Sequence, residues 1–204
     1  MKLKKGTIGK YLFDGLLIVF SVLFALFINR LAENSDLKEK KKAALTSIRS
    51  ELYRNAGVLK LWQENHVKVR DRIDSLLTGK NDSLMRKLQG YDYLNLGELM
   101  GGENLVDAIF VNTSWESAKS TGIVSEFDFE ITQQLTSAYD MQNELTKSTL
   151  GGIRDILFER ETHQIDQLRP TLRQLQFRFY EVVGQEIVVE KLISEALNEL
   201  KDTN

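Results

Sequence analysis

The hydrophobic and polar positions divide the chain into one apolar run near the amino terminus and several amphipathic stretches behind it. Residues 16–28 carry no charge, and the wider stretch 11–29 is interrupted by only one charged side chain, that of Asp14. An α-helix rises ~1.5 Å per residue, so about 20 apolar residues cross the hydrocarbon core of a bilayer. The pattern therefore predicts a transmembrane helix over residues 11–29, preceded by a basic flank at residues 1–10.

A cleaved secretory signal peptide is the alternative interpretation of this apolar run. Its basic start and apolar middle fit a signal peptide, but the exit at residues 28–33, INRLAE, lacks the small-x-small pattern that signal peptidase requires. We therefore expect an uncleaved anchor. The four lysines before the run favour an amino terminus inside the cell and an extracytoplasmic carboxyl domain, whereas the lysine-rich residues 38–42 could instead lie on an anionic cytoplasmic leaflet.

A heptad pattern begins behind the anchor. Apolar side chains recur there at alternating steps of three and four residues, which is typical of a coiled coil or an elongated bundle. We call these positions the first seam: Leu45, Ile48, Leu52, Asn55, Leu59, Trp62, His66, Val69, Ile73 and Leu76. No proline or glycine cluster separates the seam from the anchor, and Gly79 begins a turn. The pattern predicts one helix that continues from the membrane through residues 30–78.

The carboxyl-terminal end of the chain repeats the heptad pattern. Pro170 suits the first turn of a helix. Beyond it lies what we call the second seam: Leu172, Leu175, Phe179, Val182, Glu186, Val189, Ile193, Ala196 and Leu200. The two seams could pair antiparallel within one chain or form the shared core of an oligomer, and we expect the intramolecular pairing.

Three polar side chains interrupt the seams, namely Asn55, His66 and Glu186. We expect each of them to lie near a seam edge and to reach water. The alternative is burial, in which a polar side chain fixes register or oligomer number at a cost in stability. A buried His66 would in addition link assembly to pH.

Residues 79–204 are expected to form a helical bundle domain, which makes the fold all-α: a transmembrane helix, a long coiled-coil-like helix and an elongated bundle. A capping box at residues 113–116 starts a short helix, and Gly122 permits the turn that ends it. We expect Trp115 to fill the gap between this helix and its neighbours. Gly151-Gly152 is expected to break a later helix.

Residues 91–102 form the least helical stretch of the chain, with apolar side chains spaced by glycines. Apolar side chains in a loop usually pack back onto the domain, and we expect that outcome here. The alternative is an exposed patch that binds a partner.

Composition narrows the possible functions. One proline among 204 residues, with 27% charged and 42% hydrophobic side chains, favours long helices with few forced breaks. The absence of cysteine excludes a disulfide framework, a thiolate metal site and a cysteine nucleophile. A net charge of −2 gives no broad basic surface of the kind that nucleic-acid binding needs, so no nucleic-acid partner is expected.

Candidate catalytic and metal-binding residues are few. Glu159, His163 and Asp166 would share one face of a helix and could contribute to a metal site, but we expect a solvated face. The sequence contains no phosphate-binding glycine loop and no nucleophile elbow. We therefore expect no enzyme activity, no cofactor and no bound metal.

The anchor itself offers two weak features. Ser21 and Ala25 form a small-x-x-x-small pair that could let two helices approach closely. Asp14 is expected at the headgroup boundary, and the alternative is a carboxylate that lines a pore or pairs with a partner.

The segment 112–122, NTSWESAKSTG, followed by Leu135 and Tyr139, resembles an uncharacterised family of bacterial single-pass membrane proteins. The anchor exit at residues 25–29, ALFIN, is similar to the exit in that family, although Leu31 stands where a tryptophan is often found. The resemblance implies an amino-terminal anchor, a long charged helix and a bacterial membrane. It implies no catalytic residues.

These observations favour a non-enzymatic, single-pass protein of the bacterial inner membrane that acts as an oligomerising scaffold or a partner-binding subunit. Its expected partners are the lipid bilayer and either further copies of the chain or another membrane protein. Candidate contact or packing residues are Asp14, Ser21, Ala25, Asn55, Trp62, His66, Trp115, Gly122 and Glu186. Two alternatives stay open: an oligomeric pore or membrane-disrupting effector, and a signalling subunit that relays motion through the long helix.

Overall fold

A single helix, α1 (Lys5–Leu77), contains both the apolar run and the first seam. The computed structural model describes residues 5–201, with side chains from residue 13 onward, so the side chains of the expected basic flank at residues 1–10 lie outside the description. The chain divides into two compact units, Met1–Ala44 and Leu45–Asn204. The helix is unbroken at this division, as the sequence predicts, and its second half belongs to the same unit as the rest of the chain.

The first unit holds the one helix among the described residues that is long and apolar enough to cross a membrane. An 18-residue window of it has a mean hydropathy of 2.2, and none of that window is buried. The large apolar side chains from Phe13 to Leu31 are all exposed.

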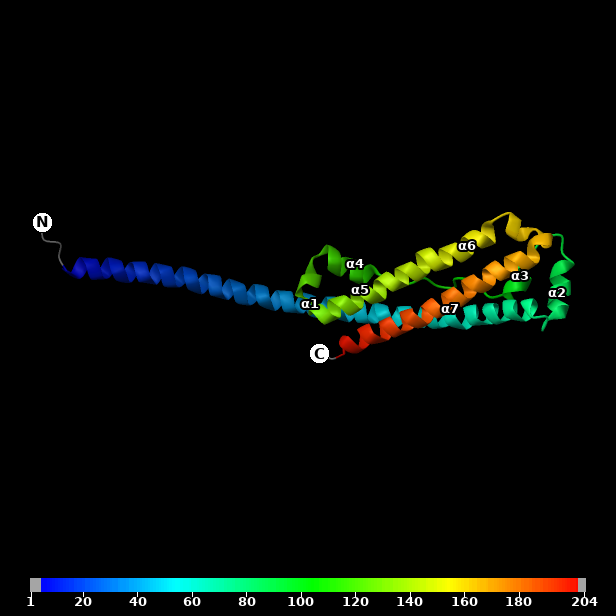
Figure 1. Cartoon of the computed structure of the whole chain (residues 1–204). Helices are drawn as coiled ribbons and strands as arrows, with labels where there is room; N and C mark the ends of the chain where they lie inside the picture. The colour runs from blue at the N-terminus through cyan, green and yellow to red at the C-terminus, as the bar shows by residue number, and fades with distance from the viewer. Residues whose placement is uncertain (1–4, 202–204) are drawn as a thin grey trace. The chain divides into compact units, whose positions relative to one another are not determined.

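The second unit is built from helices, and the described residues form no strand beyond one isolated bridge between Tyr93 and Gln164 (Figure 1). The all-α prediction is confirmed. After α1 come α2 (Asp82–Gln89), α3 (Leu96–Met100), α4 (Thr113–Ser120), η1 (Ile123–Glu126), α5 (Phe129–Glu144), η2 (Leu145–Thr149), α6 (Leu150–Phe158), η3 (Glu161–His163), η4 (Ile165–Gln167) and α7 (Leu168–Glu199).

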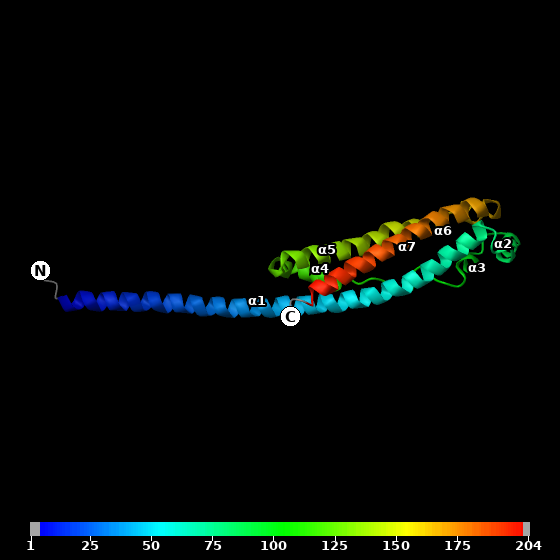
Figure 2. The same ribbon diagram turned by 60° about the horizontal axis from the view of Figure 1, so that its bottom comes forward.

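The two seams pair antiparallel inside this unit, along the second half of α1 and the length of α7 (Figure 2). Gln63 bonds to Glu190, and Asp74 bonds to Gln176, so partner numbers fall along α7 as they rise along α1. Every seam residue is buried except Leu45, which is half-buried. The expected intramolecular pairing is confirmed, and α5 and α6, which pack on α7, complete the core.

Helices α5 and α6 lie beside α7 and are joined by the π-helical turn η2 into one continuous helical segment. The predicted break at Gly151-Gly152 is wrong, because both glycines lie inside α6. A glycine costs a helix about 1 kcal/mol relative to alanine, which tertiary packing readily offsets. Here Gly151 is buried, and the Cβ position of Gly152 lies 3.5 Å from the guanidinium carbon of Arg178 on α7.

The predicted helical face of Glu159, His163 and Asp166 is also wrong. Helix α6 ends at Phe158, and the two short 3₁₀ turns η3 and η4 follow, so the three side chains share no helix. His163 Nε2 instead bonds to the carbonyl oxygen of Leu157 at 2.9 Å. Among the described residues, no group of three His, Asp or Glu side chains could hold a metal ion.

Most of the stretch that follows α2 packs back onto the domain, as expected, whereas Tyr93 is 62% exposed. Leu94, Leu99 and Met100 are buried, and Gly101 ends α3 in a left-handed conformation with φ +70°. The positive φ favours glycine there, and a side chain at this position would also displace the flexible guanidinium end of Arg72.

Candidate functional site

A line of buried polar side chains runs along α1 and is the most distinctive site in the second unit. Asn55, His66 and Glu186 are all 0% exposed, so the expectation that they reach water at a seam edge is wrong. What covers α1 is the chain segment 103–112, which lies outside helix and strand. Backbone groups in such a segment need hydrogen-bond partners when they are buried. The polar side chains of α1 supply them, and we call segment 103–112 the strap.

His66 bonds to the start of the strap and to α7 at once. Its Nδ1 lies 2.6 Å from Oε1 of Glu186, and its Nε2 lies 2.8 Å from the carbonyl oxygen of Leu105. A carbonyl oxygen only accepts, so Nε2 carries a proton, and a second proton lies between Nδ1 and the carboxyl group. The pair is neutral overall whichever partner holds that second proton. This explains how two ionisable groups are tolerated in a fully buried seam.

Trp62 holds the middle of the strap. Its indole Nε1 donates to the carbonyl oxygen of Ala108 at 3.0 Å, and its ring packs against Phe110 with centroids 4.5 Å apart. The large aromatic side chain therefore adds apolar contact to the polar attachment, which is the usual role of a buried tryptophan.

Asn55 holds the end of the strap through both of its amide groups. Its Nδ2 donates to the carbonyl oxygen of Val111 at 2.7 Å, and its Oδ1 accepts from the Val111 amide at 2.9 Å. The same Nδ2 also donates to Gln142 Oε1 on α5 at 2.7 Å. One asparagine thus joins α1, the strap and α5.

Glu51 completes the line by capping α4 from another helix. Its carboxylate accepts from the amides of Ser114 at 2.8 Å and Trp115 at 3.4 Å, at the amino-terminal end of α4, where a negative charge is favourable. The predicted capping box is therefore wrong: Asn112 precedes the helix, and its side chain makes no cap bond. The sequence distance of 63 residues between Glu51 and Ser114 hides this partner from local pattern analysis.

Tyr139 of α5 joins the same carboxylate. Its hydroxyl donates to Glu51 Oε1 at 2.5 Å, and its ring stacks on Trp115 with centroids 5.6 Å apart and planes 4° apart. Burial, and next the hydrogen bond to Glu51, raise the pKa of this hydroxyl far above its ordinary value of 10.0. Trp115 is 3% exposed and lies between α4 and α5, while Gly122 turns the chain after α4 with φ +76°.

Sequence reasoning identified Asn55, Trp62 and His66 as special but missed Glu51 and Gln142. Glu51 directly precedes the seam position Leu52, and only its position near Trp115 in space makes it a cap. The available signal was the strap itself, since a stretch with no secondary-structure pattern must find its hydrogen bonds elsewhere.

The candidate residues of the anchor lie apart from this site, in the first unit. Asp14, Ser21 and Ala25 are all exposed on α1. The Ser21 hydroxyl donates to the carbonyl oxygen of Leu17 at 2.8 Å, so its hydrogen bond is satisfied within the helix.

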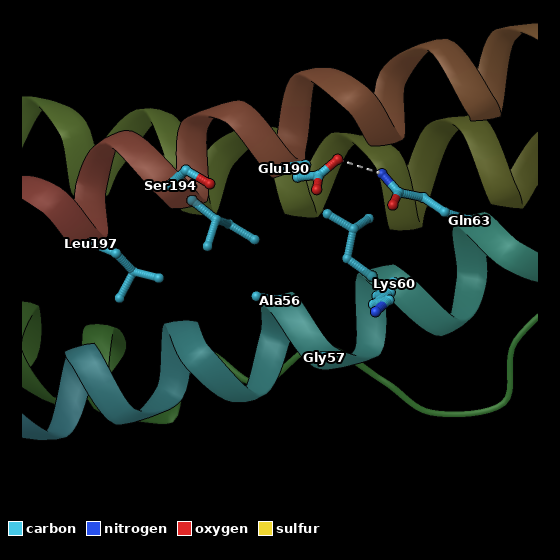
Figure 3. Close-up of a pocket in the computed structure, with 9 residues that line it drawn as sticks. Ala56, Gly57, Lys60, Gln63, Glu190, Ser194 and Leu197 are labelled. Carbon is cyan, nitrogen blue, oxygen red and sulfur yellow. Dashed lines mark hydrogen bonds between the residues drawn. The ribbon is translucent and has the colours of Figure 1, made fainter.

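Among the hollows on the surface of the second unit, two involve α1. One lies between α1 and α7, has a volume of about 330 Å³ and is crossed by the bond from Gln63 to Glu190 (Figure 3). The other, of about 470 Å³, lies where α1 meets the start of α4 and includes Glu51 and Arg54. The Glu51 carboxylate there is already bonded to the backbone of α4 and to Tyr139.

Comparison of the chain with protein-family models, curated proteins and solved structures gives no match. The structure by itself defines the class: an all-helical protein in which one helix, long and apolar enough to cross a membrane, runs without a break into a packed helical domain.

Proposed function

We propose that the chain is a single-pass protein of a bacterial inner membrane and that its domain Leu45–Asn204 is a non-enzymatic scaffold that binds protein. The observation that carries the proposal is the exposure of the apolar run on every side of α1, from Phe13 at 65% to Ile28 at 48%. A surface helix of a water-soluble protein is apolar along one stripe only. A helix that is apolar all round and unburied suits the hydrocarbon of a bilayer.

The buried polar line supports a structural role for the ionisable residues of the domain. His66, Glu186 and Glu51 bind backbone groups of the strap and α4, or each other, and lie inside the domain. Groups committed in this way stabilise a fold and are poorly placed to reach a substrate. The bacterial membrane is supported by the resemblance at residues 112–122, and the extracytoplasmic domain by the four lysines before the anchor.

The anchor is tested by membrane extraction and mass measurement of the full chain. We expect the chain to stay in the membrane pellet after an alkaline carbonate wash and to keep its full mass of 23.4 kDa. A Leu23→Arg variant, with a charge near the middle of the apolar run, is the matched control and should be extracted more readily. Release of the unaltered chain by carbonate, or a mature chain that begins near Glu33, would contradict the anchor. Leakage of dye from vesicles that carry the chain would instead favour the pore alternative.

A further inference from the structure

Helix α7 carries a second apolar stripe on the face that points away from the core. Its members are exposed: Phe177 at 74%, Tyr180 at 51%, Ile187 at 60% and Val188 at 46%, with Gly184 exposed between them. Each lies two positions from a second-seam residue, which is roughly 200° around a helix. The stripe, which we call the outer stripe, is therefore opposite the seam. Tyr180 is held to α1, because its hydroxyl donates to Asp74 Oδ2 and the guanidinium of Arg70 lies over its ring, 5.5 Å from the centroid. The Phe177, Ile187 and Val188 side chains are the exposed apolar surface of the stripe.

Two side chains of opposite charge lie at the two ends of the outer stripe. Arg173 lies 11 residues before Gly184 and Glu195 lies 11 residues after it. Eleven residues make about three turns, so both side chains share the face of Gly184. The positive charge thus lies toward the amino-terminal end of α7 and the negative charge toward its carboxyl-terminal end, whereas the helix dipole favours the opposite order. In addition, α7 has no acidic residue in its first turn and no basic residue in its last turn. Within α7, Lys191 Nζ lies 3.7 Å from Glu195 Oε1, and Arg173 Nη1 donates to Gln176 Oε1 at 2.9 Å. Both charged side chains remain accessible at the surface, so each can also meet a charge on a second copy.

The arrangement is complementary to itself when it is turned end for end about Gly184. Phe177 and Lys191 lie seven residues on either side of the glycine, and Tyr180 and Val188 lie four residues on either side. A two-fold axis at Gly184 thus sets Phe177 against Lys191, Tyr180 against Val188 and Arg173 against Glu195 of the second copy, twice per pair. The methylene groups of Lys191 can pack on the Phe177 ring. A parallel pairing would set Arg173 against Arg173, which repels.

We propose that the outer stripe of α7 binds the same stripe of a second copy, antiparallel, about a two-fold axis at Gly184. No atom lies within 4 Å of the Cβ position of Gly184, so the helices can approach closely at the axis. Helices pack at 8–10 Å between axes, with the shorter distances at small residues. The protein that the proposed scaffold binds is then a second copy of the same chain. The membrane location of this pair rests on the proposed function.

Cysteine cross-linking of the full chain tests the axis. The chain contains no cysteine, so Gly184→Cys introduces a single thiol at the proposed axis. The matched control is Thr136→Cys, an exposed position on α5. We expect oxidation to convert Gly184→Cys to a covalent dimer in phospholipid vesicles and in mild detergent, and Thr136→Cys to stay monomeric. Equal cross-linking of the two variants would overturn the proposal.

Charge reversal tests the partner and the direction. Arg173→Glu and Glu195→Arg should each weaken the dimer roughly tenfold, since each turns two attractive contacts into repulsive ones. The double variant restores opposite charges and should regain the dimer, as measured by the mass in detergent. A stripe that bound lipid or an unrelated protein would show no such rescue, and a double variant as weak as the single ones would overturn the proposal. Circular dichroism checks that all three variants are folded.

The two proposals fail in different ways. A chain that stays in carbonate-washed membranes but gives no Gly184→Cys dimer would keep its anchor and lose the self-association. A chain that forms the dimer but is released by carbonate would keep the self-association and lose the anchor.

Discussion

At the scale of single residues, the pair of His66 and Glu186 shows how an ionisable couple becomes part of an apolar seam. Both are fully buried, and Glu186 Oε2 has no hydrogen-bond partner among the described residues. Replacing one member of a buried pair leaves the other uncompensated, and this costs far more than replacing both with apolar side chains.

We therefore predict that His66→Leu lowers the free energy of unfolding by about 3–5 kcal/mol. The double variant His66→Leu with Glu186→Leu should recover part of that loss. Glu186→Gln is the mild control, since an amide can donate to Nδ1 while Nε2 still donates to Leu105, and it should cost only about 1 kcal/mol. Trp62 and Trp115, both in the second unit, report denaturant unfolding by fluorescence. Additive losses in the double variant would contradict the pairing.

Tyr139 makes a prediction about pH. Its pKa is raised in the folded chain, so above about pH 10 an unfolded tyrosine loses its proton while folded Tyr139 keeps it. The unfolded state then binds fewer protons, and the free energy of unfolding falls as pH rises, by up to about 1.4 kcal/mol per pH unit. The Tyr139→Phe variant has no ionisable hydroxyl at this position, so this loss of stability at high pH is absent from it. The variant also loses the hydrogen bond to Glu51 at every pH.

The variant should thus be less stable than the parent chain at about pH 8, by about 1–2 kcal/mol, and the difference should shrink above about pH 10. Urea unfolding at a series of pH values measures both. A stability difference that stays constant to about pH 11 would show that Tyr139 ionises normally in the folded chain.

At the scale of helices and turns, periodic patterns were sufficient to predict α1, α7 and their pairing, because a seam of four heptads leaves few ways to bury its apolar side chains. Short local motifs predicted the ends of helices less well. Gly151-Gly152 predicted a break that packing overrode, and the capping box at residues 113–116 was replaced by Glu51. The candidate site depended on partners 39 to 120 residues apart in sequence, such as His66 with Leu105 and Glu186, which no spacing rule reveals.

Alanine substitutions at two glycines are predicted to change the free energy of unfolding in opposite directions. Gly152→Ala should raise the free energy of unfolding by about 0.5–1 kcal/mol, because the new methyl group would meet Arg178 at an ordinary contact distance inside a helix. Gly101→Ala should lower it by about 1 kcal/mol, because φ is +70°, a conformation that is strained for any residue with a side chain. Thermal unfolding of both variants compares them directly, and a loss of stability in Gly152→Ala would mean that the close approach of Arg178 dominates.

At the scale of the whole molecule, the chain joins a helix with no apolar partner in the structure to a domain whose apolar seams are internally satisfied. The resemblance at residues 112–122 and the direction of insertion remain predictions. Two of the exposed apolar surfaces are the apolar run of α1 and the outer stripe of α7, which we assign to lipid and to a second copy.

The most direct test of the anchor places single cysteines on α1 of this cysteine-free chain. Ser21→Cys lies within the apolar run and Ser35→Cys lies beyond it, and both serines are exposed on the helix. With the chain in native membranes opened to both sides, a charged, water-soluble maleimide should label Ser35→Cys but label Ser21→Cys only after the membrane is dissolved in detergent. Equal labelling of both positions before detergent would show that the apolar run lies in water, and would contradict the account.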